Sequence, residues 1–388
     1  MGQAAIDHSP GLTSDLQDPV VELQVIRQKR AQAVPAEQFS RFRTSPLTPL
    51  RKRGVDFENR LYEATDIKVG TNLNTLFQGL SDEIPGEDDF GMASFLSMVA
   101  TYDGCHKGKP CQGELTLGLE GRWNWGTTDP VALGQLGLGS LGFTANPFGT
   151  YTPTFIVRNL FWRQGSREAG WMYRIGRVTP DQFLMTSRHL NPLTTFLPIG
   201  GTGPFAMGIS DSGLGMFGGL FLTDRVNIAG VVADANADRF DFGDLDEGDL
   251  FTAVELQWKI LPITKNAGYS KVAVWHNHGT KFGQAGNGGT GKEGWGVFIK
   301  LEQELTSDGR AIAIGRWGRS YKDSALYDRV AAAHLVLYDP FYRGSYKALG
   351  YNADVFGIAY NMVRPTAAPR DESNVEAFYH FLLFPQMD

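Results

Sequence analysis

The chain has 388 residues, with 36 Lys and Arg against 42 Asp and Glu, so its formal net charge is −6. This charge argues against a nucleic-acid-binding protein, which would carry a basic excess. No apolar run approaches the roughly 18 residues of a membrane-spanning helix, which excludes a helical membrane protein. The 47 glycines and the 12% aromatic content favour many strands joined by turns.

Residues 1–60 differ from the rest and are predicted to form an N-terminal arm or plug segment. Five prolines divide this region into short pieces, and Val20 to Ala33 has the composition of a short helix. Met1 to Asp7 shows neither the basic nor the apolar region of a secretory signal peptide. Either the protein is cytoplasmic, or its N-terminus is processed or wrongly assigned.

From about Leu61 onward, apolar and polar residues alternate with a period of two, as in strands. Leu117 and Leu119, for example, lie on the face opposite Thr116 and Glu120. The runs are about 8–12 residues long, which suits a tilted strand that crosses a bilayer. About fourteen such segments are expected, near residues 64–79, 90–102, 112–125, 152–163, 170–177, 214–222, 225–234, 250–261, 269–277, 294–305, 310–318, 329–338, 353–362 and 374–384.

The connections between these segments are alternately short and long, as in a transmembrane β-barrel. Trp123 and Trp125 stand at the end of a segment, like the aromatic girdles of such barrels. Residues 61–388 are therefore predicted to form an all-β, transmembrane antiparallel β-barrel. A large soluble β-sandwich is the alternative, because its strands would also alternate.

Cys105 and Cys111 are the only two cysteines, and they enclose a short loop with Gly108 and Pro110. In an oxidising compartment they would form a disulfide. Free thiols are the alternative, and a metal site would need more ligands than the adjacent His106 supplies.

Three motifs are weak signals for a ligand. Gly137 to Gly142 fits G-x-G-x-x-G, but neighbouring glycines and Pro147 argue against the helix that a nucleotide site requires. His276 and His278 share a strand face without an obvious third metal ligand. An acidic stretch at 234–249 could hold Ca²⁺ through oxygen ligands, although a solvated loop explains it equally. No metal and no cofactor are therefore expected.

Several segments stand together in the order and spacing of a known family. They are Leu50–Phe57 with Arg53-Gly54-Val55, Leu117–Gly126, Tyr173–Asp181, Gly213–Asp238 and Glu376–Tyr379. Over most of the chain from about Leu50, the sequence resembles the carbohydrate-selective porins of the OprB type. The resemblance implies an outer-membrane barrel of about sixteen strands, in which sugars diffuse past an arginine-lined constriction. Fourteen segments fall about two short of that number, so the last strands are expected to be missing.

Charged residues on the polar strand faces are predicted to line the pore. Because Arg at the bilayer midplane costs ~2–4 kcal/mol, the apolar face must point to lipid and Arg122 and Arg174 must point inward. The predicted pore-lining residues are Glu120, Arg122, Asn124, Arg158, Arg163, Arg174, Arg177, Lys300, Glu302 and Arg316. Guanidinium groups donate paired hydrogen bonds that suit hydroxyl groups. The alternative is that these charges form salt bridges that only stiffen the wall.

The sequence thus predicts a channel in the bacterial outer membrane for passive diffusion of carbohydrates or similar small polar solutes. No catalytic grouping stands out, so no enzymatic activity is expected. The expected partners are sugar solutes and outer-membrane lipid, and a homotrimer is one assembly open to such a chain. A channel for anions or other solutes is one alternative, because pore-lining arginines suit anions equally well. A soluble glycan-binding β-protein is the other.

Overall fold

The computed structural model describes residues 48–149, 155–187, 189–237, 242–243, 245, 248–259, 266, 268–279, 290–338, 340, 354–368 and 370–380. Its strands are β1 (Ile67–Gly79), β2 (Phe90–Cys105), β3 (Gly113–Asn124), β4 (Phe155–Ser166), β5 (Trp171–Val178), β6 (Gly213–Phe221), β7 (Val226–Asp234), β8 (Leu250–Lys259), β9 (Gly268–Asn277), β10 (Gly294–Glu304), β11 (Ala311–Tyr321), β12 (Tyr327–Tyr338), β13 (Val355–Pro365) and β14 (Glu372–His380). Each of the fourteen predicted segments overlaps one of these strands. The predicted all-β fold is confirmed.

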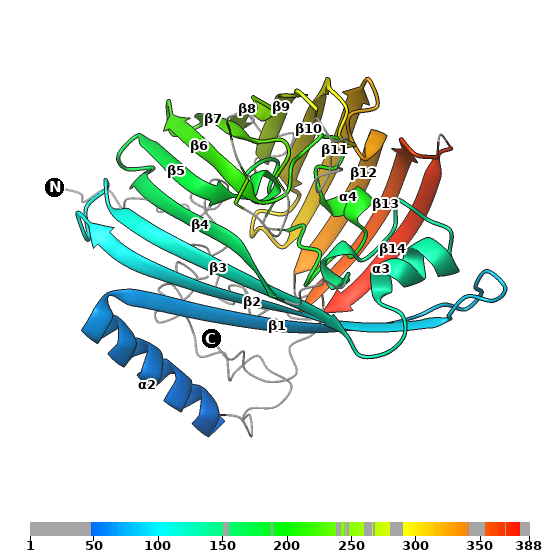
Figure 1. The fold of residues 1–388 in the computed structure, drawn as a ribbon, viewed down its shortest axis with the longest axis horizontal. Coiled ribbons are helices and arrows are strands. Elements are labelled where there is room, and N and C mark those ends of the chain that lie inside the picture. Colours follow the sequence, from blue (N-terminus) through cyan, green and yellow to red (C-terminus); the bar gives the residue numbers. More distant parts are fainter. Residues whose placement is uncertain are drawn as a thin grey trace.

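The strands form a single sheet of antiparallel neighbours, in which each strand pairs with the next one along the chain. Figure 1 shows this sheet curling from β1 (blue) to β14 (red) around a space that contains other parts of the chain. Within the described strands, β1 and β14 are the two edges of the sheet. The two further strands that a count of about sixteen requires are not among the described residues.

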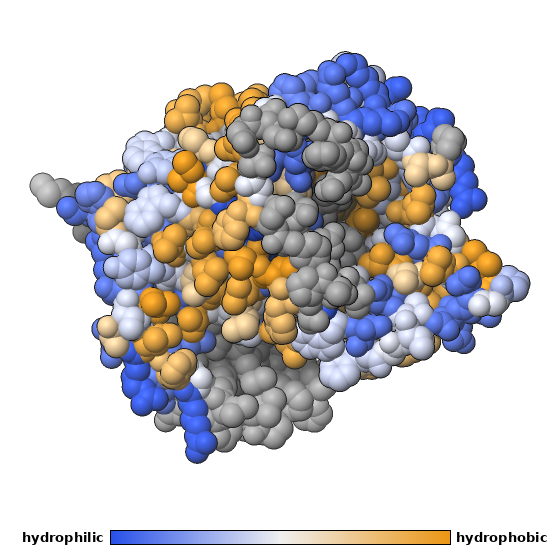
Figure 2. All heavy atoms as spheres, in the orientation of Figure 1, coloured by the Kyte–Doolittle hydropathy of each residue, from blue (hydrophilic) through white to orange (hydrophobic). Residues whose placement is uncertain are grey.

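The two faces of the sheet have the reverse of the polarity found in a soluble protein. On the outer, convex face, Val254 and Val274 are direct partners and are 52% and 54% exposed. On the inner, concave face, Lys271 and Lys300 are also direct partners, and both are fully buried. Successive side chains of a strand point to opposite faces, so this polarity follows from the alternation in the sequence. Figure 2 shows hydrophobic residues gathered in the middle of one side of the molecule.

Two long connections fold against the inner face. The first inner segment, residues 125–149, follows β3, and the second inner segment, residues 179–212, lies between β5 and β6. Their short helical turns are α3 (Pro130–Ala132), η2 (Leu133–Gly137), η3 (Asn146–Phe148), η4 (Pro180–Gln182) and α4 (Ile199–Thr202). Figure 1 shows α4 within the curve of the sheet, where it contacts β12 and β13.

The main apolar core lies between the second inner segment and the inner face of the sheet, which we call the wall. Phe183 of this segment packs against Phe217 of β6, with 5.2 Å between the ring centres. The segment also contributes the buried residues Phe205 and Met207 to the same cluster. The inner space of the sheet is thus partly filled by a packed segment, which fixes the position of that segment.

A helix that the sequence did not predict, α2 (Thr48–Thr65), precedes β1. Pro49 stands in its first turn, where the missing N–H of proline costs no hydrogen bond. The helix ends at Thr65, and the next residue, Asp66, has a φ of 58° where the chain turns into β1. Figure 1 shows α2 beside the edge strand β1 and outside the curve of the sheet. The predicted helix at residues 20–33 lies outside the described residues, and no described helix is long and apolar enough to cross a membrane.

In the structure Cys105 and Cys111 are both free thiols, and the disulfide between them stays a prediction. Cys105 lies opposite Gly113, so Cys111 is displaced by two residues from the position across the strands. A side chain at Gly113 would clash, since a Cβ there would lie 2.7 Å from the sulfur of Cys105.

Candidate functional site

A row of three basic residues crosses the inner face on β9, β10 and β11. Lys271 lies directly opposite Lys300, and Lys300 lies directly opposite Arg316. All three side chains are buried. Directly opposed like charges destabilise a sheet, so each of these cations needs an acceptor close by.

Two carboxylates of the wall neutralise the two lysines. The Nζ atom of Lys271 lies 3.4 Å from Glu255 on β8, and that of Lys300 lies 3.3 Å from Glu302 on β10. Both ammonium groups also reach Thr186 of the second inner segment. Lys271 donates to its hydroxyl at 3.2 Å, and Lys300 donates to its carbonyl oxygen. Thr186 is therefore held by two cations at once.

The same carboxylates bind the second inner segment directly. Glu255 accepts the backbone N–H of Met185 at 2.6 Å, and Glu302 lies 3.4 Å from Nε2 of His189. The Nδ1 atom of His189 lies 2.5 Å from the hydroxyl of Tyr338 on β12. Charged and polar groups from β8, β9, β10 and β12 thus fix Met185, Thr186 and His189 to the sheet.

Arg316 holds the next part of the second inner segment. Its guanidinium donates to the carbonyl oxygens of Gly201 and Gly203, the latter at 2.8 Å. The guanidinium carbon also lies 5.1 Å from the ring centre of Phe298, which is within cation–π range. The guanidinium therefore satisfies two backbone carbonyls at the C-terminal end of α4, where carbonyls lack helical partners.

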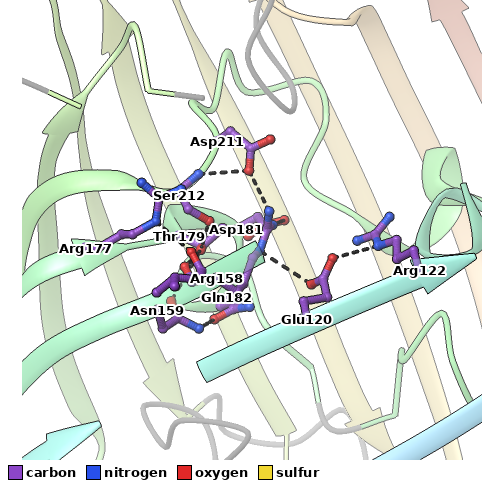
Figure 3. Close-up of polar contacts among 11 residues, drawn as sticks. Glu120, Arg122, Arg158, Asn159, Arg177, Thr179, Asp181, Gln182, Asp211 and Ser212 are labelled. Atoms are coloured by element: carbon purple, nitrogen blue, oxygen red, sulfur yellow. Dashed lines mark hydrogen bonds and ion pairs between the residues drawn. The ribbon is translucent and has the colours of Figure 1, made fainter. Parts of the chain in front are cut away.

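A second charged cluster joins β3 and β4 to both ends of the second inner segment, as Figure 3 shows. Glu120 accepts a 2.6 Å hydrogen bond from Nε of Arg122 and lies 3.7 Å from Nε of Arg158. Arg158 also donates to Asp211 at 2.5 Å and lies 3.9 Å from Asp181. Because these aspartates stand at the two ends of the segment, Arg158 ties both ends to the wall.

Arg174 faces the inner side, as predicted, but aromatic residues cover it. Its guanidinium carbon lies 4.3 Å from the ring centre of Phe183 and 5.4 Å from that of Phe217. The side chain is only 1% exposed. Arg174 therefore lies beneath the second inner segment, where it supports that segment and does not meet a solute.

Of the remaining predicted residues, some lie within the strands and one lies at a strand end. Arg177 is buried and donates from Nε to the carbonyl of Val157 at 2.7 Å. Arg163 donates to Glu114 at 2.9 Å. Asn124 is exposed at the end of β3, where its amide bonds to a backbone carbonyl of the following turn. Arg177 pairs with Leu160 and Leu214, in the phase of the exposed Ile175 and Met216, so the register does not place it on the inner face. The structure thus brings the other charged predicted residues to the inner face and leaves Asn124 at the strand end.

The buried charges of the described residues balance in number. The basic ones are Arg122, Arg158, Arg174, Arg177, Lys271, Lys300 and Arg316, and the acidic ones are Asp103, Glu114, Glu120, Asp211, Asp234, Glu255 and Glu302. Neither sign is in excess among these buried side chains.

Sequence reasoning missed several residues that shape this site. Lys271 follows the alternation of β9, so its inner position was readable from the sequence. Asp211 and Thr186 lie in a connection without periodicity, and only the structure places them against the wall. Glu372 and Glu376 were passed over, although both stand on the polar face of an alternating strand.

The weak ligand motifs acquire no ligand set. His276 and His278 pack edge to face, with 4.7 Å between their ring centres. Within the described ranges, no group of three or more metal-binding side chains is found. Most of the acidic stretch at 234–249, from Asp238 to Glu247, lies outside the described residues apart from single positions. Residues 137–142 belong to the first inner segment and do not follow a strand in a βαβ unit.

Known structures share this fold. The solved structure of OprB from Pseudomonas putida at high pH matches with a TM-score of 0.66 and 11% identity, covering 86% of this chain and 89% of that chain. The low-pH structure of the same protein matches with a TM-score of 0.52 and 12% identity, covering 86% and 88%. No family model and no curated protein sequence matches this chain. At such low identity the likeness establishes the fold, so the expected OprB-like architecture is confirmed.

Proposed function

We propose that this protein is an outer-membrane porin, through which carbohydrates or similar small polar solutes diffuse passively. The observation that carries the proposal is the polarity of the sheet, with exposed valines outside and buried lysines, arginines and glutamates inside. In water this arrangement would expose apolar surface for no gain. In a bilayer the outer face meets lipid and the polar face lines a hydrated interior.

The second inner segment supports a selective rather than a wide pore. It crosses the inner space and is fixed by Arg158, Glu255, Lys300 and Arg316 on different strands. A segment held at so many points narrows the path to a defined width. Selectivity then arises from the width of the path and from the polar groups beside it.

The balanced charges favour neutral polar solutes over ions of one sign. The guanidinium and carboxylate groups of the inner face named above are buried and paired with one another, so they present a passing solute with pairs and not with charges of one sign. The proposal includes a bacterial outer-membrane location, contact with membrane lipid and a homotrimer as the assembly. It includes no catalytic step, since diffusion needs none.

An anion channel is the second candidate, and the row of Lys271, Lys300 and Arg316 favours it. The row is opposed by Glu255 and Glu302, each within 3.4 Å of one lysine. We therefore expect weak charge selectivity.

Osmotic swelling of proteoliposomes tests the proposal. Purified full-length protein is reconstituted, and swelling is recorded with glucose, gluconate and glucosamine, which have similar size and different charge. The proposal predicts swelling with all three, fastest with glucose. Swelling no faster than that of protein-free liposomes would refute the porin, and swelling with gluconate alone would favour the anion channel.

A further inference from the structure

We propose that Glu372 is a positioning residue that fixes the first inner segment across the pore, by filling a nest of hydrogen-bond donors in residues 140–142. The inference rests on the proposed function, since it concerns the width of the same pore. It gives a role to the glycine-rich stretch 137–142, for which the sequence alone offered only a nucleotide site.

The carboxylate of Glu372 lies in a ring of donors from one turn. It accepts from Oγ of Ser140 at 2.9 Å, from the backbone N–H of Gly142 at 3.0 Å and from that of Leu141 at 3.4 Å. Successive backbone N–H groups that converge in this way form an anion-binding nest. Hydrogen bonds to an ionised carboxylate are about twice as strong as neutral ones. The carboxylate of Glu372 is therefore the anion that occupies the nest in residues 140–142.

The glycines of this stretch are needed for the approach to the wall. Gly139 has a φ of +60°, which favours glycine. A Cβ at Gly142 would lie 2.2 Å from the side chain of Val363 on β13 and 3.1 Å from the carboxylate of Glu372. Only a residue without a side chain lets the turn lie this close to β13 and β14.

The contacts between Glu372 and residues 140–142, which we call the clasp, continue into the second inner segment. The N–H groups of Ile199 and Gly200 bond to the carbonyls of Thr144 and Gly142 at 3.3 and 3.2 Å. Four residues beyond Glu372 on the same face of β14, Glu376 accepts the N–H of Leu197 at 2.9 Å. One edge strand thus presents two carboxylates, one for each inner segment, and the segments also bond to each other.

The position of Glu372 therefore affects more than its own turn. If the clasp opens, the turn at 140–142 loses its fixed anion, and α4 loses two partners that hold it from one side. The pore would then spend more time in wider arrangements. A carboxylate that only stabilised β14 would leave the width of the pore unchanged.

The test is a double-mutant cycle read as single-channel conductance in planar bilayers. The variants are Glu372→Ala, Ser140→Ala and both together, with Asp371→Asn as the matched control. Asp371 is the neighbouring acid, and it pairs with Arg329 on the exposed surface. Heat-modifiable migration on gels shows that each variant is folded before it is recorded.

We expect Glu372→Ala to raise the fraction of time in wider conductance levels about tenfold, which corresponds to about 1.4 kcal/mol. Ser140→Ala should have a smaller effect in the same direction. The double variant should resemble Glu372→Ala alone, because Glu372→Ala already removes the hydrogen bond that Ser140→Ala removes. Asp371→Asn should match the parent protein.

Folded Glu372→Ala channels that spend no more time in wider conductance levels than the parent protein would overturn the clasp, as would effects of the two single variants that simply add. If the parent protein forms no channel at all, the proposed function fails, and this outcome is distinct from failure of the clasp.

Discussion

Arg316 and Arg319 stand three residues apart on β11 and point to opposite faces of the sheet. Arg316 is 4% exposed and bonds to backbone carbonyls of the second inner segment. Arg319 is exposed on the outer face, where its guanidinium carbon lies 5.2 Å from the ring centre of Tyr321. Two residues of one type on one strand thus have different surroundings, which makes them a matched pair for mutation.

Arg316→Ala is expected to loosen α4 from the wall. The carbonyls of Gly201 and Gly203 would lose their donor, and a hydrogen bond to a charged group contributes about 1.5–3 kcal/mol. We expect a lower urea midpoint in lipid vesicles and noisier single-channel currents. Arg319→Ala is the control, and it should change the current levels little. Equal effects of the two variants on conductance would contradict the assignment of faces.

Glu302→Gln is expected to destabilise the folded protein by about 3–5 kcal/mol, because it leaves the buried ammonium of Lys300 without its carboxylate. The variant also weakens the contact with His189 and the 2.8 Å hydrogen bond from Ser187. Urea unfolding in vesicles measures the loss. Asp323→Asn, at an exposed ion pair with Lys292, serves as the control and should change stability by less than about 1 kcal/mol. Equal midpoints for the two variants would show that the inner network contributes no stability.

Val254→Arg tests whether the outer face lies in lipid. An arginine near the bilayer midplane destabilises a transmembrane barrel by about 2–4 kcal/mol, whereas the same change on a water-exposed surface would be nearly neutral. Folding into vesicles, followed by urea titration, gives the value. Val254→Leu keeps the apolar character and should change the midpoint little. A fully tolerated arginine would mean that this face is not covered by lipid.

Arg122→Ala and Arg174→Ala should have different consequences. Arg122 donates to Glu120, which keeps Arg158 as a second cation, so its loss should alter conductance and sugar block while the fold survives. Arg174 is enclosed by Phe183 and Phe217, so its loss removes packing as well as charge and should lower stability. Recording conductance and urea midpoints for both variants separates the two roles. The reverse pattern would show that Arg174, and not Arg122, meets the solute.

The fold was predictable to a large extent because alternation is a local signal. Strands such as β8 show a period of two in the sequence, in which Val254 lies on the outer face and Glu255 on the inner face.

The inner segments were not predictable, since their position depends on contacts between distant residues. Thr186 is placed by lysines 85 and 114 residues away, and the turn at Ser140 by a carboxylate 232 residues away.

Single-channel recording of the parent protein with added sugar tests the central claim most directly, that the inner face lines a sugar-permeable pore. The account predicts stepwise currents in potassium chloride, a small reversal potential across a salt gradient because the buried charges balance, and a current that falls as a neutral disaccharide is added. A bilayer that stays closed at every protein concentration, or steady currents that no sugar reduces, would contradict it.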